Sequence, residues 1–235
     1  MTVDRLRWPE VRDYYTGLRP ATYLLALPDQ GVIYVKNPKA GCSTLLAWLD
    51  RIHTGDWDTP RTGNIHVSHQ LPRIRDVGRG RVMRMLSGAA YRFTFVRDPL
   101  RRLESVYWDK FVHSQSWGTR SQVKDKLPVG PDGRIAFEAF LDLIEQQDPL
   151  TEMDPHWRPQ HVNLLHPLVH YDRIGRLESF ADDLDLISQE AGLPPVPRET
   201  RNTTRSREAS VYDGRPDLVA RVQALYALDF ELYGY

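Results

Sequence analysis

The sequence is poor in cysteine, because its 235 residues contain only Cys42. One cysteine cannot form a disulfide within the chain, which excludes a disulfide-stapled secreted scaffold and is typical of proteins in a reducing compartment. Long hydrophobic runs are also absent from the N-terminal part, where the apolar run at residues 23–27 is far too short to span a bilayer. The first ten residues lack the apolar stretch of a signal peptide. These absences predict a cytoplasmic protein that does not associate with membranes.

An excess of either charge is missing as well: 31 Lys and Arg balance 31 Asp and Glu. A neutral chain argues against a protein that wraps nucleic acid or coats an anionic surface, but a local pocket for a small anion remains compatible. The length and an ordinary hydrophobic content of 41% suit a globular protein with a sizeable core. We expect residues 1–235 to form one domain, with residues 1–30 as an irregular lead-in.

The most informative stretch is residues 32–44, VIYVKNPKAGCST. Its β-branched and aromatic start predicts a buried strand, and apolar residues at helical spacing beyond Gly41 predict a helix. A turn that leads from a strand into a helix presents backbone N–H groups to an anion. Lys39 adds a full charge, and Ser43 and Thr44 add hydroxyl groups. The stretch is not a Walker A loop, because its lysine precedes the glycine. The alternative is an ordinary turn with a solvated lysine.

A second strand is predicted at residues 91–96 and leads directly into Arg97. Asp98 suits the N-cap and Pro99 the first position of the following helix. On that helix Arg101, Ser105 and Asp109 form a polar stripe. Ligands of α/β folds bind at the carboxyl ends of strands, so both candidate anion sites fall at the same edge of the sheet.

The remaining pattern alternates strands with helices, which predicts an α/β fold with a mostly parallel sheet flanked by helices. Residues 55–72 read as a loop, and the arginine-rich residues 73–84 as a solvated, mobile surface or, alternatively, as a binding lip for an acidic substrate. The other expected elements are a helix at 135–147, a strand at 169–177, a helix from about residue 180 to 192, a last helix around 218–225 and an aromatic tail at 230–235.

Two segments together, PKAGCS at 38–43 and FVRDPLRRLESVY at 95–107, resemble the sulfotransferase superfamily. The chain is most similar to the carbohydrate branch that includes the HNK-1 and chondroitin 4-O sulfotransferases. The resemblance extends to residues 154–160, 171–178 and 229–235, so it covers most of the chain from residue 32 onward. It implies a P-loop-like α/β fold.

The resemblance implies that 3′-phosphoadenosine 5′-phosphosulfate (PAPS) donates the sulfuryl group and leaves as adenosine 3′,5′-bisphosphate. The first segment then binds the 5′-phosphosulfate and the second the 3′-phosphate, while Lys39 neutralises the leaving oxygen during in-line displacement. A late basic loop is expected to close on the donor. The implied donor-binding residues are Lys39, Ala40, Gly41, Cys42, Ser43, Thr44, Arg97, Ser105, Arg201 and Arg205. The scheme requires no metal.

The acceptor hydroxyl needs a general base, and histidine suits neutral pH. His66 and His69 lie between the two motifs, where related enzymes keep a catalytic histidine, and His66 is slightly preferred. His156 and a glutamate are the other candidates, and both loop histidines can instead be merely exposed. The acceptor is expected to be a carbohydrate or another small molecule, such as a natural product.

The chain also departs from the family pattern. The carbohydrate enzymes are typically Golgi membrane proteins with disulfides, so their location does not carry over to a sequence with one cysteine. Two other functions compete with sulfuryl transfer. One is a P-loop-like small-molecule kinase, which would require Mg²⁺. The other is a non-catalytic module that binds nucleotides or polyanions, whose binding would depend steeply on salt.

Overall fold

The sheet has four strands in the order β1-β2-β3-β4 in the computed structural model, which describes residues 7, 9, 11, 23–61, 63–113, 127–131, 133–196 and 209–235. The hairpin of β1 (Leu24–Leu27) and β2 (Val32–Val35) is antiparallel. Strand β2 pairs in parallel with β3 (Tyr91–Val96), and β3 in parallel with β4 (Arg173–Arg176). The α/β class and the mostly parallel sheet are therefore confirmed, as are the strands predicted at 32–35 and 91–96.

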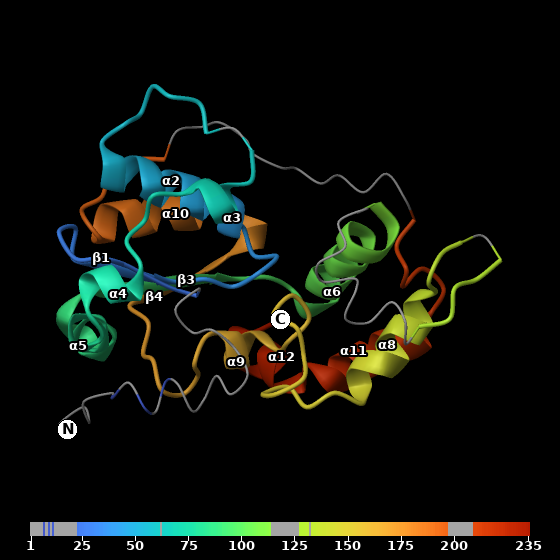
Figure 1. The fold of residues 1–235 in the computed structure, drawn as a ribbon. Helices are drawn as coiled ribbons and strands as arrows, with labels where there is room; N and C mark the ends of the chain where they lie inside the picture. The colour runs from blue at the N-terminus through green and yellow to red at the C-terminus, as the bar shows by residue number, and fades with distance from the viewer. Residues whose placement is uncertain are drawn as a thin grey trace.

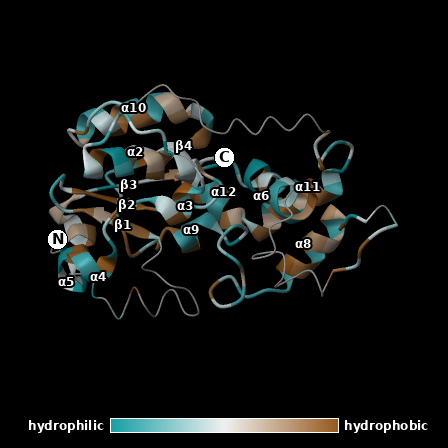
Figure 2. Ribbon diagram, turned by 45° about the horizontal axis from the view of Figure 1, so that its top comes forward, coloured by the Kyte–Doolittle hydropathy of each residue, from teal (hydrophilic) through white to brown (hydrophobic). Residues whose placement is uncertain are grey.

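Helices cover both faces of the sheet (Figure 1). On one face, α2 (Cys42–Thr54) and α10 (Phe180–Glu190) pack over strand residues such as Tyr34 and Phe93. On the other face, Ile33 and Val35 pack with residues of α4, α5 and α12. Because side chains alternate along a strand, burial on both faces explains why β1 and β2 are hydrophobic throughout (Figure 2). The helices introduced here are α4 (Ile74–Val77), α5 (Arg79–Arg84) and α12 (Ala227–Tyr233).

A second group of helices lies beside the sheet and has its own core (Figure 1). It contains α6 (Pro99–Tyr107), α8 (Phe137–Glu145) and α11 (Pro216–Leu225). Helix α6 belongs to this group and also starts directly at the end of β3. Its N-terminus forms as the sequence predicts, since the side chain of Asp98 accepts a hydrogen bond from the Arg101 amide at 2.9 Å. The helix therefore connects the edge of the sheet to the second core.

Several predicted boundaries are wrong. Residues 24–27 are not part of an irregular lead-in: they form β1, because the turn at residues 28–31 folds them back onto β2. Residues 73–84 form α4 and α5, which bury Ile74, Val82 and Met83, while their arginines are exposed as expected for a solvated surface. A short helix, α3 (Ile65–Ser68), interrupts the predicted loop at 55–72. Strand β4 is shorter than predicted.

The helix expected after residue 180 is confirmed as α10, and the aromatic tail is largely helical as α12. A one-turn helix, α9 (Gln160–Asn163), lies against α12. Two π-helical segments, η2 (Met85–Ala89) and η3 (Trp108–His113), and a 3₁₀ turn, η4 (Leu177–Ser179), complete the elements used below. Among the described residues, no helix combines the length and the apolar character needed to cross a bilayer.

Candidate active site

The turn between β2 and α2 adopts a strained backbone. Lys39 and Gly41 both have positive φ, 69° and 79°. A Cβ atom on Gly41 would lie 2.5 Å from Cε2 of Phe180, so both the conformation and the space require glycine here. A lysine in the left-handed region costs free energy and is held there only by its surroundings, as is common in ligand-binding loops. The turn ends at the N-terminus of α2, where the first amides of the helix point outward.

Two buried amide side chains fix this turn to the end of β3. Asn37 donates from Nδ2 to the carbonyl of Phe95 at 3.0 Å and to Oε1 of Gln160 at 2.9 Å. Gln160 in turn accepts from the Arg97 amide at 3.0 Å and donates to the Arg97 carbonyl at 2.8 Å. Asn37 and Gln160 are fully buried, so these bonds are protected from water. The two predicted anion-binding segments are thus held side by side.

The buried guanidinium of Arg102 adds a second clamp. It donates to the carbonyls of Pro38 at 3.1 Å, Arg158 at 2.8 Å and Pro155 at 2.9 Å. Only 2% of Arg102 is exposed, and burial lowers the pKa of its guanidinium. One side chain of α6 therefore joins the turn at Pro38 to the segment at residues 154–158.

Two cationic side chains meet at the turn. Arg97 donates from a terminal guanidinium nitrogen to the carbonyl of Lys39 at 3.4 Å. The ammonium of Lys39 pairs with Asp109 at 3.0 Å, and Asp109 also contacts Lys110 at 3.2 Å. Burial lowers the pKa values of both Lys39 and Arg97, and the carboxylates of Asp109 and Glu178 respectively oppose these shifts. Two partly buried cations beside the N-terminus of α2 suit a ligand with two separated anionic groups.

His66 is an exposed residue of α3, as the alternative interpretation of the loop histidines expects, and its ring contacts the same turn. Its Nε2 lies 3.0 Å from Oγ of Ser43 and 3.8 Å from Sγ of Cys42. Desolvation, together with the nearby Lys36 and His156, lowers the pKa of His66 to about 4. His66 is therefore neutral at pH 7. The Cys42 thiol is buried, and burial raises its pKa.

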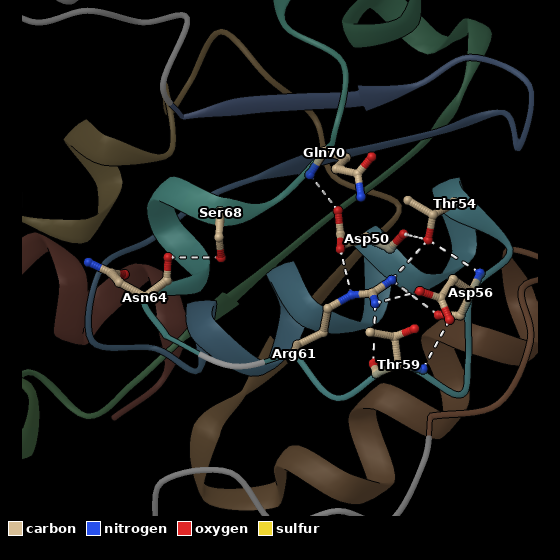
Figure 3. Close-up of polar contacts among 8 residues, drawn as sticks. All are labelled: Asp50, Thr54, Asp56, Thr59, Arg61, Asn64, Ser68 and Gln70. Carbon is tan, nitrogen blue, oxygen red and sulfur yellow. Dashed lines mark hydrogen bonds and ion pairs between the residues drawn. The ribbon is translucent and has the colours of Figure 1, made fainter.

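Polar contacts around Asp50 hold the loop that carries His66 (Figure 3). On α2, the buried carboxylate of Asp50 accepts a hydrogen bond from Nε of Arg61 at 2.8 Å and another from the backbone N–H of Gln70 at 2.6 Å. Arg61 also reaches Asp56 at 3.0 Å and Oγ1 of Thr54 at 3.0 Å. Both ends of the loop are thereby attached to one side chain of α2.

The structure brings most of the predicted site residues to one edge of the sheet. Lys39, Arg97, Ser43 and His66 lie around the turn, as described above. Ser105 is half-buried on α6, one turn before Asp109, the partner of Lys39. Ala40 is buried and its amide donates to Asn37, while the Thr44 amide donates to Gly41 within the first turn of α2.

His69 lies at the C-terminal end of α3, and burial lowers its pKa. Its Nδ1 is buried and has no hydrogen-bond partner within the described part of the chain. Arg201 and Arg205 lie outside the described residues. Within the arginine-rich residues 73–84, Arg81 lies away from this site: it contacts Asp29 at 3.8 Å in the β1–β2 turn, at the opposite edge of the sheet. Arg73 contributes to lowering the pKa of His69.

Sequence reasoning missed the residues that fix the site. Asn37, Gln160 and Arg102 stand in the quoted segments, but their partners are 53 to 123 residues away, so no local pattern indicates the contacts. The sequence indicates Asp109 only as a member of the polar stripe with Arg101 and Ser105. Its position, four residues after Ser105 on the same helix face, was the available signal.

The sequence comparisons agree with this geometry. A profile described as "Sulfotransferase family" matches residues 23–235. Carbohydrate sulfotransferase 11 of Mus musculus is 24% identical over 242 residues, which cover 91% of this chain and 67% of the relative. Carbohydrate sulfotransferase 14 of Homo sapiens is 31% identical over 160 residues, which cover 62% of this chain and 42% of the relative. No solved structure matches.

A strand-turn-helix unit at the carboxyl edge of a mostly parallel sheet is where α/β enzymes bind anionic ligands. The family match places the chain more narrowly: it belongs to the sulfotransferase family and is an enzyme that transfers sulfate. The predicted family resemblance is confirmed.

Proposed function

We propose that the protein transfers the sulfuryl group of PAPS to a hydroxyl of a carbohydrate or another small molecule. The observation that carries this proposal is the contact of Arg97 with the Lys39 carbonyl at 3.4 Å. It joins the two segments that the family resemblance assigns to the two anionic ends of the donor. The strand-turn-helix arrangement supports a P-loop-like donor site, although the lysine stands before the glycine.

The residues at this edge fit such a donor. The amides of Gly41, Cys42 and Ser43 at the N-terminus of α2 suit the 5′-phosphosulfate, whereas the predicted amides of Ala40 and Thr44 already donate within the turn. The guanidinium of Arg97 with the hydroxyl of Ser105 suits the 3′-phosphate. The strained Lys39 and the partly desolvated Arg97 form a site that gains from an anionic ligand. Arg201 and Arg205 are proposed to contribute from the late loop.

When bound, PAPS supplies an activated sulfuryl group whose departure leaves negative charge on a phosphate oxygen. Lys39 is placed to neutralise that charge, because its ammonium lies in a partly buried environment where a cation acts strongly. The ammonium of Lys39 must first leave the carboxylate of Asp109 before it can contact the ligand. The buried clamps of Asn37, Gln160 and Arg102 keep the turn in place during this exchange.

The acceptor hydroxyl must lose its proton to a base, for which His66, His69, His156 and a carboxylate are the candidates from the sequence. The sequence prefers His66 or His69, and of the two, His66 has its Nε2 at the turn. A carbohydrate acceptor is proposed because the similar proteins are named carbohydrate sulfotransferases. A single domain, cytoplasmic location, and the lack of nucleic-acid or membrane partners remain predictions from the sequence.

Calorimetric titration tests the donor assignment. We expect adenosine 3′,5′-bisphosphate to bind more tightly than 5′-AMP or ATP in buffer with EDTA, and Arg97→Ala to remove that preference by losing ~10-fold or more in affinity. Arg81→Ala, at the opposite edge, is the matched control and should bind like the wild type. Tighter binding of ATP, or no effect of Arg97→Ala, would refute the assignment and favour the kinase.

A further inference from the structure

An aspartate-histidine pair lies beside the donor turn and is not used by the scheme above. Nδ1 of His156 lies 2.6 Å from Oδ1 of Asp154, and the same oxygen accepts the backbone N–H of His156 at 2.8 Å. The Asp154 side chain is 13% exposed and the His156 side chain 32%. The carboxylate therefore orients the ring and fixes the tautomer with the proton on Nδ1, which leaves the Nε2 lone pair available at a partly exposed position.

The pair is held at the active site by the buried clamp. Arg102 donates to the carbonyls of Pro155 and Arg158, on either side of His156, and to the carbonyl of Pro38, which precedes Lys39. His156 is close enough to His66 to contribute to lowering its pKa. The clamp thus holds the backbone on either side of His156 to the turn, and the ring of His156 lies within electrostatic range of His66.

His66 is less suited to take a proton from the acceptor. Its Nε2 is already engaged with the Ser43 hydroxyl at 3.0 Å. Lys36 and Lys110 both contribute to lowering its pKa, and at about 4 that pKa makes it a weak base. These surroundings suit a group that orients Ser43 toward the donor.

We propose that His156, oriented by Asp154, is the general base that accepts the proton of the acceptor hydroxyl, while His66 positions Ser43. This inference rests on the proposed sulfuryl transfer. The acceptor oxygen forms a bond to sulfur as the bond from sulfur to the bridging oxygen breaks, and the electron pair of that bond stays on the departing phosphate, opposite Lys39. The hydroxyl proton moves to Nε2 of His156, and Asp154 compensates the charge that the ring acquires.

The chain contains a matched pair that serves as a control. His161 Nδ1 lies 2.7 Å from Oδ1 of Asp229, but Asp229 is fully buried and also accepts the amides of Gln160 and His161 at the start of α9. The histidine whose pKa His161 influences is His166 rather than His66. This second pair stabilises the fold, so two aspartate-histidine pairs of similar geometry have different roles.

The test combines donor binding with sulfuryl transfer from radiolabelled PAPS to a panel of p-nitrophenyl glycosides. We expect His156→Ala to lower kcat by ~10²–10⁴-fold and to change the affinity for adenosine 3′,5′-bisphosphate less than twofold. Asp154→Asn keeps an oxygen that can accept the backbone N–H of His156, so we expect a lower kcat and an unchanged donor affinity. Asp154→Glu keeps the carboxylate and should recover part of the rate. His161→Ala should lower Tm and leave kcat within about threefold.

A second readout needs no acceptor. With adenosine 3′,5′-bisphosphate bound, His156 should still react with diethyl pyrocarbonate, and His66 should be protected, as measured by peptide mass spectrometry. The assignment is overturned if His156→Ala retains wild-type kcat, if it loses donor affinity together with rate, or if His156 does not react with the reagent. Failure of the wild type to bind the bisphosphate would instead refute the donor site, and is measured first.

Discussion

The two sides of the active site are built by different means. On the donor side, Asn37, Gln160 and Arg102 make buried hydrogen bonds between segments 53 to 123 residues apart. On the side of the histidine loop, Arg61 binds Asp50, Asp56 and Thr54, which are 5 to 11 residues away. The donor side therefore depends on the folded sheet and both cores, whereas the histidine loop is attached locally to α2. Substitutions on the donor side should therefore disturb the structure of the whole protein, and substitutions in the histidine loop should disturb only the loop.

The largest effect is expected from Arg102→Met, which leaves three buried carbonyls without their donor. We expect the free energy of unfolding to fall by about 3–5 kcal/mol, since each unsatisfied buried group costs ~1–3 kcal/mol. Urea denaturation measures this. Arg101→Met, its exposed neighbour on α6, should change stability by less than about 0.5 kcal/mol. A loss of under about 1 kcal/mol for Arg102→Met would show that the clamp does not hold the site.

Lys39→Met should affect catalysis rather than folding. We expect the rate of sulfuryl transfer from PAPS to fall by ~10²–10³-fold, as for the loss of one electrostatic group in a partly buried site. Lys110→Met is the matched control, because both lysines pair with Asp109 but only Lys39 belongs to the turn. Its rate should stay within about tenfold of the wild type. Equal losses in the two variants would contradict the role given to Lys39.

Arg61→Ala should act locally. It leaves the buried carboxylate of Asp50 without its ion pair, which should cost ~1–3 kcal/mol of stability by urea denaturation. Affinity for adenosine 3′,5′-bisphosphate should change less than threefold, because the donor side keeps its own clamps. Arg75→Ala removes an arginine whose side chain is 74% exposed and should be nearly neutral. A large loss of donor affinity in Arg61→Ala would remove the distinction between the two sides.

The smallest effect concerns pH, because His66 is an exposed residue and solvent screens its interactions. The pKa of His66 is about 4 in the folded protein, against about 6.5 for an unperturbed histidine. Between these values the unfolded chain binds the proton and the folded protein does not, so His66 makes stability fall as pH decreases from about 6.5 to about 4. His66→Gln should flatten the pH dependence of Tm in that window. An unchanged slope would show that His66 is not held neutral by the fold.

Local chemistry explains what the sequence could predict. Continuous β-branched and aromatic runs fixed the strands at 32–35 and 91–96, and Asp98 with Pro99 fixed the start of α6. The sequence does not predict strand β1, although residues 28–31 include turn-forming residues. A four-residue apolar run is too short to identify as a strand without its pairing to β2.

Most of the site geometry depends on contacts that no local pattern contains. The bond from Asn37 to Gln160 spans 123 residues, and the contact of Ser43 with His66 requires the loop to fold back over α2. The thiol of Cys42 shows the same limit. A helix N-terminus can lower the pKa of a thiol, but burial, which the sequence does not show, raises the pKa of Cys42.

Hydrogen exchange measured with and without adenosine 3′,5′-bisphosphate tests the central claim most directly, because it reports on the amides assigned to the donor. The account predicts slower exchange in peptides that cover residues 38–46 and 97–105, and a smaller change at residues 70–84, which contain the arginine-rich helices at the opposite edge. Protection centred on residues 70–84, or no protection at 38–46 under saturating ligand, would contradict the donor site.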